Sequence, residues 1–540
     1  MKLRIASLIV VFSLLLSVLP ITALAAADPV ELEAIAETKK GQAVTVKGIS
    51  SFSEVNIKVL RPDGSILYFN IVPVSGGKFT DTITLAETEK AGTYQVVAGQ
   101  GATVDLITFK VADDTTGTPP QGGGGGGGTS SPGDTTEDWY KVTSGSTTNF
   151  VTFDDEKLKA QFTKLAGQGG SPELLVDLSK EAIADTVAEL PASVLLEGFI
   201  QVSGAIIVIK TAAGSYTLPL SVLDLVSLAD RLGTTLDRVT IRISVTKVSE
   251  AMSAEIESGL RELGGSLVGD ALEFKVIAEG NGRSIELNDF GTTYVKRTIV
   301  LPTEVNSDSA TGLLYEAATG EFSFVPATFG NENGKKTATL YRNGNSIYAV
   351  ANVSKSFSDL GNHWAKADIE LLASKLIVNG VKEGIFAPDQ TITRAEFSAL
   401  LVRALALPGD AASAAVFTDV KGTAWYAGAV GAAVKAKLAN GFDEGTFRPN
   451  EPITREQMAV LVSKAILAAG KSSPKTASLA PFSDQAKIST WAKEAVGQSV
   501  EAGIVTGTDK GAFEPGANAT RAQAAVMLKR LLQHVEFINK

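Results

Sequence analysis

The sequence predicts a multidomain protein with an N-terminal β-sandwich, a central α+β or mostly β domain and an all-α C-terminal region. Three observations support this fold class: short alternating strands up to residue 112, an unbroken glycine run at 122–128, and a helical pattern that recurs three times after residue 356. Because one core seldom exceeds about 250 residues, a chain of 540 residues must divide into several domains.

The first 25 residues have the composition of a secretory signal peptide. Lys2 and Arg4 precede an apolar stretch from Ile5 to Leu19, and small residues follow at 23–27. We therefore expect residues 1–25 to be removed and the mature protein to be secreted. No later segment reaches the roughly 20 consecutive apolar residues that span a bilayer, so we expect no membrane partner for the mature form.

Charge and composition exclude several classes of function. The chain has 49 basic and 59 acidic residues without a basic run, so we expect no nucleic-acid partner. It has no cysteine, which excludes thiol catalysis and cysteine-ligated metals. Its two histidines, His363 and His534, cannot supply a Ser-His-Asp triad or a zinc site outside the repeats. The sequence therefore predicts no cofactor and no metal.

A glycosidase is the enzymatic alternative, because two carboxylates are sufficient for that chemistry. Surface charge on turns explains the available carboxylates better, so we predict that the protein is not an enzyme. The candidate carboxylates are Asp154, Asp155, Glu156, Glu286 and Asp289.

Residues 28–112 contain six short apolar segments, a pattern that favours a β-sandwich. The expected strands are Ala43–Lys47, Glu54–Leu60, Ile66–Val72, Phe79–Leu85, Gly92–Val97 and Leu106–Val111. Turn residues such as Pro62–Gly64 and Gly76–Gly77 separate them. In these strands and turns the segment resembles bacterial immunoglobulin-like modules, and the resemblance implies a spacer without chemistry.

Residues 113–138 are rich in Thr, Pro and Gly and predict a flexible linker. No Lys-Ser or Lys-Thr pair follows the glycine run, which excludes a phosphate-binding loop. Residues 139–355 mix strand and helix patterns and predict the central domain. Its expected elements are strands at Ile200–Lys210, Arg238–Val245 and Glu273–Ala278, helices at Ser221–Leu232 and Glu250–Leu263, and hairpins over 290–350 that include a strand at Tyr341–Ala349.

Four landmark residues, Trp, Gly, Phe and Arg, recur three times with gaps of 16, 6 and 8 residues. A Phe-x-Asp element precedes each Trp, and a Gly-x-Phe-x-Pro element precedes each Arg. The repeats span 356–415, 416–478 and 481–540. Their Trp, Gly, Phe and Arg landmarks are Trp364, Gly380, Phe386 and Arg394; Trp425, Gly441, Phe447 and Arg455; and Trp491, Gly507, Phe513 and Arg521.

Each repeat predicts a helix, a loop and a second helix. The second helix begins with a Thr-x-x-Glu/Gln capping box at Thr393, Thr454 and Thr520, and apolar residues then recur with helical spacing. Since one repeat cannot bury its apolar face alone, we expect the three repeats to pack as one unit.

The Arg of each repeat stands in the first helical turn, where the helix dipole disfavours a cation. One interpretation is an anion site formed by the helix N-terminal amides and the guanidinium. The other is a structural pair with Asp359, Asp419 or Asp484. The Trp residues also have two interpretations, as core residues or as platforms on which a sugar stacks.

With these motifs, residues 356–540 resemble three S-layer homology domains. The resemblance implies a pseudo-threefold helical bundle whose grooves bind secondary cell wall polymer, a pyruvylated polysaccharide of Gram-positive walls. It implies that the polymer-binding residues are Asp359, Trp364, Gly380 and Arg394; Asp419, Trp425, Gly441 and Arg455; and Asp484, Trp491, Gly507 and Arg521. Repeat 2 departs with Thr-Arg-Glu-Gln at 454–457 and repeat 3 with Gly516–Ala519, which leaves the relative strength of the grooves open.

The sequence thus predicts a secreted surface protein that is anchored non-covalently to the cell wall. Residues 28–355 have two competing interpretations, an architectural segment of a surface layer or an adhesin for an external ligand. Residues 290–350 resemble an unnamed module found beside such repeats, which implies location without activity. Aromatic residues make up 7% of the chain and are scattered, which favours architecture slightly. Self-assembly into a surface layer stays open.

Overall fold

The computed structural model describes residues 30–52, 54–61, 66–86, 89–100, 103–112, 138–167 and 172–540. The predicted signal peptide, and the predicted linker except its last residue, lie outside these ranges. The chain divides into two compact units, residues 1–131 and 132–540, and each is described by itself. Within the described ranges, no helix has both the length and the apolar character that crossing a bilayer requires.

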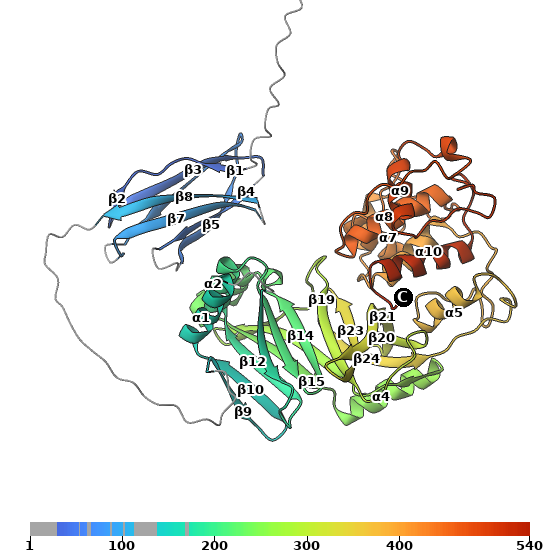
Figure 1. The fold of residues 1–540 in the computed structure, drawn as a ribbon, viewed down its shortest axis with the longest axis horizontal. Helices are drawn as coiled ribbons and strands as arrows, with labels where there is room; N and C mark the ends of the chain where they lie inside the picture. Colours follow the sequence, from blue (N-terminus) through green and yellow to red (C-terminus); the bar gives the residue numbers. More distant parts are fainter. Residues whose placement is uncertain are drawn as a thin grey trace, which may run out of the picture. The chain divides into compact units, whose positions relative to one another are not determined.

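The first unit consists of strands, as its alternating sequence predicts (Figure 1). In β3 (Ala43–Ser50) every second side chain is buried, the pattern of a strand with one face in a core. One sheet has the order β1 (Val30–Leu32), β3 and β6 (Lys78–Thr84). The other has the order β2 (Thr38–Lys39), β8 (Thr103–Ala112), β7 (Gly92–Gln100), β4 (Glu54–Leu60) and β5 (Ile66–Pro73). All six predicted strands are present, and side chains of both sheets share one hydrophobic core.

The central region of the second unit contains two more sheets. The longer one has the order β21 (Glu321–Val325), β20 (Ala310–Glu316), β24 (Ser346–Val353), β17 (Leu272–Gly280), β15 (Thr240–Lys247), β12 (Asp185–Pro191), β10 (Thr148–Phe153) and β9 (Tyr140–Ser144), with β16 (Gly265–Leu267) on β24 and β18 (Arg283–Glu286) on β17. The shorter one has the order β11 (Glu173–Leu178), β13 (Ile206–Thr211), β14 (Gly214–Pro219), β19 (Val295–Leu301), β23 (Lys335–Arg342) and β22 (Ala327–Glu332). The helices of this region are α1 (Asp155–Ala166), α2 (Ala192–Gln201), α3 (Leu225–Leu232) and α4 (Glu250–Glu262).

Two predicted strands of this region are wrong in their bounds. Ile200 lies in α2, and β13 begins only at Ile206, because α2 buries a helical apolar face with Val194 and Leu195. Tertiary packing there overrides the local preference for a strand. The predicted strand at Tyr341–Ala349 is divided by a turn at 343–345, so that β23 ends at Arg342 and β24 starts at Ser346.

The three repeats are helical, as predicted (Figure 1). The first helices, α5 (Lys366–Ser374), α7 (Ala427–Lys435) and α9 (Lys493–Glu501), each begin two residues after the Trp of the repeat. The second helices, α6 (Arg394–Ala404), α8 (Arg455–Ala468) and α10 (Arg521–His534), each begin at the landmark Arg. The three predicted capping boxes are all present, formed by Thr393 with Glu396, Thr454 with Gln457, and Thr520 with Gln523.

A ring of three backbone hydrogen bonds joins the repeats. The amide of Ile392 donates to the carbonyl of Ala519, that of Ala519 to Ile453, and that of Ile453 back to Ile392, over 2.9 to 3.0 Å. Each of these residues directly precedes the capping Thr of a second helix, and all three are fully buried. The three second helices therefore start beside one another, and the repeats pack in cyclic order as the unit that the sequence predicts.

The central region packs directly on the repeats within the second unit. Phe324 of β21 belongs to the same hydrophobic cluster as the repeat helices. The buried ammonium of Lys375, directly after α5, donates to the carbonyls of Ser307 at 2.8 Å and Ala310 at 2.9 Å. Apolar packing and a buried cation together therefore attach repeat 1 to the strands.

We predict that Ile453→Ala lowers the free energy of unfolding of the repeats by about 2 to 5 kcal/mol, because it opens a cavity beside the ring. Urea unfolding followed by helical circular dichroism measures this. Val416→Ala is the matched control, since Val416 is 63% exposed and its truncation creates no cavity. Equal losses in the two variants would contradict a central role of the ring.

The burial of Lys375 predicts that the free energy of unfolding depends on pH. Burial lowers the pKa of Lys375 to about 8 from an ordinary value of 10.5, so the charged form is disfavoured in the folded state. The unfolded chain then binds more protons between these two values, and stability must rise with pH across that window. We expect wild-type protein to gain up to about 3 kcal/mol of unfolding free energy relative to Lys375→Met from pH 8 to pH 10.5. Denaturant unfolding of both proteins over this range checks the sign, and parallel pH profiles would contradict it.

Candidate functional site

The tryptophans of the three repeats lie on the surface. Trp364, Trp425 and Trp491 are 66%, 69% and 59% exposed. Each lies two residues before the first helix of its repeat, and that helix buries other side chains in the core. This exposure excludes their interpretation as core residues. The exposed rings are therefore available for contact with a ligand.

The aspartates each hold a loop of their own repeat. The carboxylate of Asp359 accepts the amides of Phe386 at 2.9 Å and Ala387 at 2.7 Å, and Asp419 and Asp484 accept the equivalent amides in repeats 2 and 3. Desolvation raises the pKa of Asp359, but the amide hydrogen bonds outweigh it and the pKa lies below its ordinary value. The Asp thus ties the Phe-x-Asp element to the Gly-x-Phe-x-Pro element.

The landmark glycines are required by packing. A Cβ atom at Gly380 would lie 2.5 Å from the carbonyl oxygen of Ile385, and one at Gly441 would lie 2.3 Å from the ring of Phe417. Gly507 has a φ angle of 76°, which favours glycine. These three residues therefore shape the loops in which the landmark Phe rings are buried.

Each landmark Arg extends to the next repeat in cyclic order. Its guanidinium donates to a loop carbonyl there and lies within about 6 Å of that repeat's landmark Phe ring. The donor–acceptor pairs are Arg394 with Asn440 (2.7 Å), Arg455 with Phe513 (2.7 Å), and Arg521 with Asn379 (2.8 Å) and Phe386 (2.9 Å). The distances to the ring centroids are 4.8 Å to Phe447, 5.5 Å to Phe513 and 4.6 Å to Phe386, respectively.

These contacts bear on both interpretations of the landmark Arg, the anion site and the structural pair with Asp. The amides of Arg394 and Ala395 donate to the carbonyls of Glu451 and Pro449 in repeat 2, and the other two helices repeat the arrangement. The part of the predicted anion site that relied on free helix amides is therefore wrong, because carbonyl groups already satisfy them. The guanidiniums bond to carbonyls, and no Arg–Asp ion pair of the predicted kind occurs among the described residues.

One groove brings together residues of all three repeats. A cavity of about 450 Å³ is lined by Trp364 of repeat 1, by Arg455 of repeat 2, and by Gly507, Gln523 and Arg530 of repeat 3. The Nε atom of Arg455 is bound to the loop of repeat 3, and no described residue accepts a hydrogen bond from its two terminal nitrogens. Burial lowers the pKa of Arg455, but a guanidinium remains charged at neutral pH. The groove thus presents two free N–H donor groups beside an exposed indole.

Arg530 was not predicted from the sequence. It stands nine residues after Arg521, and Arg403 and Lys464 occupy the same position in repeats 1 and 2. Nine residues turn an α-helix by half a revolution beyond two full turns, so Arg521 and Arg530 lie on opposite sides of α10. The recurrent basic residue at this spacing was the signal in the sequence that could have revealed it.

The grooves are not equivalent. Central strands reach the surface around Trp425 but not that around Trp364. The cavity of about 340 Å³ at Trp425 is lined also by Arg403 and by Ser323, Phe324 and Arg342 of the central region. The central region therefore takes up space beside Trp425 that stays open beside Trp364.

The departures of repeats 2 and 3 from the common motif have structural partners. Glu456 is buried and accepts the amide and the hydroxyl of Ser489 at 3.0 and 2.9 Å, two residues before Trp491. Ala519 takes the place of Ile392 and Ile453 in the backbone ring. Neither departure disrupts the cyclic contacts.

The candidate catalytic carboxylates have roles in turns and caps. Asp154 accepts the amide of Lys157 at the start of α1, and Asp289 accepts the amide of Gly291. Glu156 pairs with Lys159 at 3.4 Å on the surface of α1. No group of three or more His, Cys, Asp or Glu side chains that could hold a metal occurs in the part of the chain that the structure describes.

A family model of the S-layer homology domain matches residues 356–398, 416–459 and 481–525. The C-terminal region carries three S-layer homology domains. The matched segments begin at the starts predicted for the repeats from their landmark residues, which confirms the resemblance.

Curated relatives match between about a third and two fifths of the chain. The chain is 36% identical over 219 residues to an amylopullulanase of Thermoanaerobacterium thermosulfurigenes, 38% over 184 residues to exoglucanase XynX of Acetivibrio thermocellus, and 34% over 185 residues to an S-layer protein of Bacillus thuringiensis subsp. finitimus. The alignments cover 41%, 34% and 34% of this chain and 12%, 17% and 22% of the relatives. The chain thus spans less than a quarter of each relative's length.

The S-layer homology domains and the S-layer relatives indicate a secreted, cell-surface-anchored protein. Two of the relatives named above carry the names of glycosidases, but the shared part is a small fraction of each. An enzymatic role of this chain does not follow from them.

We predict that Gly441→Ala destabilises repeat 2 by about 1 to 3 kcal/mol, because the new Cβ overlaps the ring of Phe417. Gly422→Ala is the matched control in the same repeat, since no atom lies within 4 Å of the added Cβ. Thermal unfolding of both variants measures the difference. Equal melting temperatures would mean that the landmark glycine is not needed for packing.

Proposed function

We propose that the protein is anchored to the cell wall by its S-layer homology domains, which bind secondary cell wall polymer bearing pyruvylated sugar. The anion of such a polymer is a carboxylate, and a guanidinium fork recognises a carboxylate through two parallel hydrogen bonds. The observation that carries the proposal is the pair of unoccupied terminal nitrogens of Arg455 beside the exposed ring of Trp364. Arg530 supplies a second positive charge to the same groove.

The groove at Trp364 is proposed as the strongest of the three. Arg521 and Arg394 each commit one terminal nitrogen to a loop carbonyl, whereas both terminal nitrogens of Arg455 are left for a ligand. The space at Trp425 is partly taken by the central region. A polymer chain would therefore meet more open space at Trp364 than at Trp425, and the most complete guanidinium fork of the three at Arg455.

The landmark Asp and Gly residues are proposed to act on the polymer through the loops that they shape. The Asp oxygens are engaged by backbone amides, and the Gly residues have no side chain to offer. The repeats themselves are proposed to form the pseudo-threefold helical bundle of the family, because their backbone hydrogen bonds close in cyclic order.

Residues 28–355 are proposed to act as a spacer or surface-layer segment without catalytic activity. The first unit fits a β-sandwich of the immunoglobulin-like kind, because its two sheets share one core. An adhesin for an external ligand is the alternative. Self-assembly through these domains stays a proposal that lattice imaging on purified walls would test.

We expect Trp364→Ala to weaken binding of the mature protein to purified sacculi about tenfold, which corresponds to about 1.4 kcal/mol. The indole is exposed, so its removal costs little folding stability and the loss reports on the ligand. Sedimentation of the protein with increasing amounts of sacculi measures the affinity.

Trp425→Ala is the matched control, since the same exposed side chain is removed from the groove that the central region narrows. We expect a smaller loss for this variant. Unchanged binding in both variants would contradict the proposed site, and a larger loss in Trp425→Ala would contradict the order of the grooves.

A further inference from the structure

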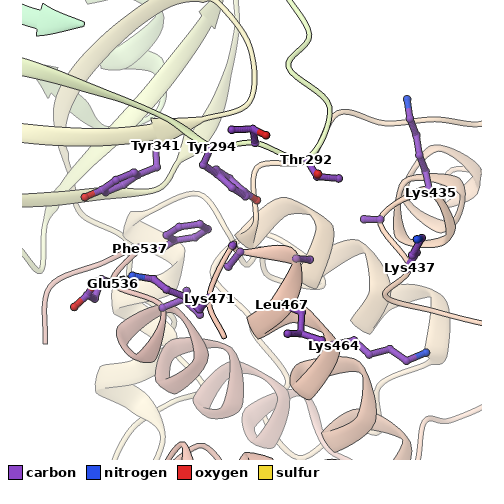
Figure 2. A pocket seen from close by; sticks show the side chains of 16 residues that line it. Thr292, Tyr294, Tyr341, Lys435, Lys437, Lys464, Leu467, Lys471, Glu536 and Phe537 are labelled. Carbon is purple, nitrogen blue, oxygen red and sulfur yellow. Dashed lines mark hydrogen bonds and ion pairs between the residues drawn. The ribbon is translucent and has the colours of Figure 1, made fainter. Parts of the chain in front are cut away.

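Another cavity lies outside the groove at Trp364, between the central strands and repeats 2 and 3. Its volume is about 740 Å³, within the usual range of ligand sites. Figure 2 shows Tyr294, directly before β19, and Tyr341 of β23 on one side of the cavity, and the helices that carry Lys435 and Lys464 on the other. Neither Trp364 nor Arg455 contributes to its lining.

Four lysines line this cavity, and two of them have no anionic partner. Lys435 pairs with Asp410 at 3.7 Å, and Lys471 pairs with Glu536 at 2.6 Å. Within the described residues, Lys437 and Lys464 form no ion pair or hydrogen bond through their ammonium groups. The cavity therefore carries uncompensated positive charge.

Helix stabilisation explains only part of this cluster. Lys435 stands in the last turn of α7 and Lys437 just beyond it, where cations are favoured by the helix dipole. Lys464, however, precedes the last turn of α8, which contains no basic residue. Burial, and after it the charge of Arg394, lower the pKa of Lys464.

The cavity also has an apolar and aromatic surface. Leu467 is 54% exposed on the side of α8 that faces it, although no folding role needs that exposure. The rings of Tyr341 and Phe537 stack with centroids 6.1 Å apart and an interplanar angle of 17°. Apolar and aromatic surface beside cations suits a sugar ring that carries an acidic group, because the ring packs on the former while the acid pairs with the latter.

The walls of the cavity are fixed before any ligand binds. The hydroxyl of Tyr294 donates to the carbonyl of Leu405 at 2.6 Å, and its ring lies 4.9 Å from that of Phe537. The carbonyl of Phe537 accepts the amide of Ala327 at 2.8 Å. A ligand would thus find strands and helices already joined, with little ordering cost.

We propose that this junction cavity is a second binding site, for an acidic polysaccharide whose carboxylate or phosphate groups pair with Lys437 and Lys464. This site is separate from the groove at Trp364, and the proposal does not depend on polymer binding in that groove. Because strands of the central region form one wall, this region takes part in carbohydrate binding instead of serving only as a spacer.

The test is a calorimetric titration of the full mature protein at low salt. The probes are hexagalacturonate, which carries carboxylates, a glycerol phosphate hexamer, which carries phosphates, and neutral cellohexaose. The variants are Lys437→Glu, which reverses a charge at the rim, and Leu467→Glu, which places a carboxylate on the exposed floor. Lys141→Glu on the edge strand β9 is the matched control, with the same charge change on an exposed residue outside the cavity.

We expect at least one acidic probe to bind, Lys437→Glu and Leu467→Glu each to weaken this binding about tenfold or more, and Lys141→Glu to leave it unchanged. Whether the carboxylate or the phosphate probe binds identifies the anion. Binding of neither acidic probe, equal binding of cellohexaose, or binding that Lys437→Glu does not weaken would overturn the proposal. Titration of Trp364→Ala separates the two sites, because probe binding that remains in this variant and is lost when Lys437→Glu is added belongs to the junction cavity.

Discussion

The closed ring of amide-to-carbonyl hydrogen bonds through Ile392, Ala519 and Ile453 is the constraint on which the arrangement of the repeats depends. It places the starts of three helices side by side, so that the first residues of each helix meet the loop of the next repeat. The first amides of each helix and the guanidinium of its Arg donate in the opposite cyclic order to the ring, from repeat 1 to repeat 2, from 2 to 3 and from 3 to 1. A groove lined by Trp364, Arg455 and Arg530 needs residues of three repeats, and a single repeat would present only part of it.

Some landmark residues hold the loops that form the grooves, and others keep side-chain atoms that a ligand could contact. Asp359 and Gly380 with their counterparts use their atoms, or their lack of a side chain, to hold the loops. The Arg residues do both, because one side of the guanidinium binds a loop carbonyl while Arg455 leaves two nitrogens unused. The exposed Trp residues contribute little to the core, which leaves their rings available to the polymer that we propose as ligand.

Local features of the repeats could be predicted from the sequence, because they depend on neighbouring residues. The capping boxes at the starts of the second helices are of this kind, since their hydrogen bonds span three residues. Non-local features could not be predicted. Nothing in the sequence indicates that the amide of Arg394 donates to Glu451, and for that reason the prediction of free helix amides was wrong. The turn that divides Tyr341–Ala349 escaped prediction because its flanks both favour strands.

The central claim, attachment through a wall polymer, is tested most directly by sedimentation of the mature protein with sacculi before and after hydrofluoric acid extraction of the secondary polymer. Our account predicts that the protein sediments with native sacculi and stays in solution with extracted ones. A triple variant with Ala at Arg394, Arg455 and Arg521 should stay in solution with both, provided that its helical circular dichroism is unchanged. Equal sedimentation of wild-type protein with native and extracted sacculi would contradict the account, because the repeats would then bind another component of the wall.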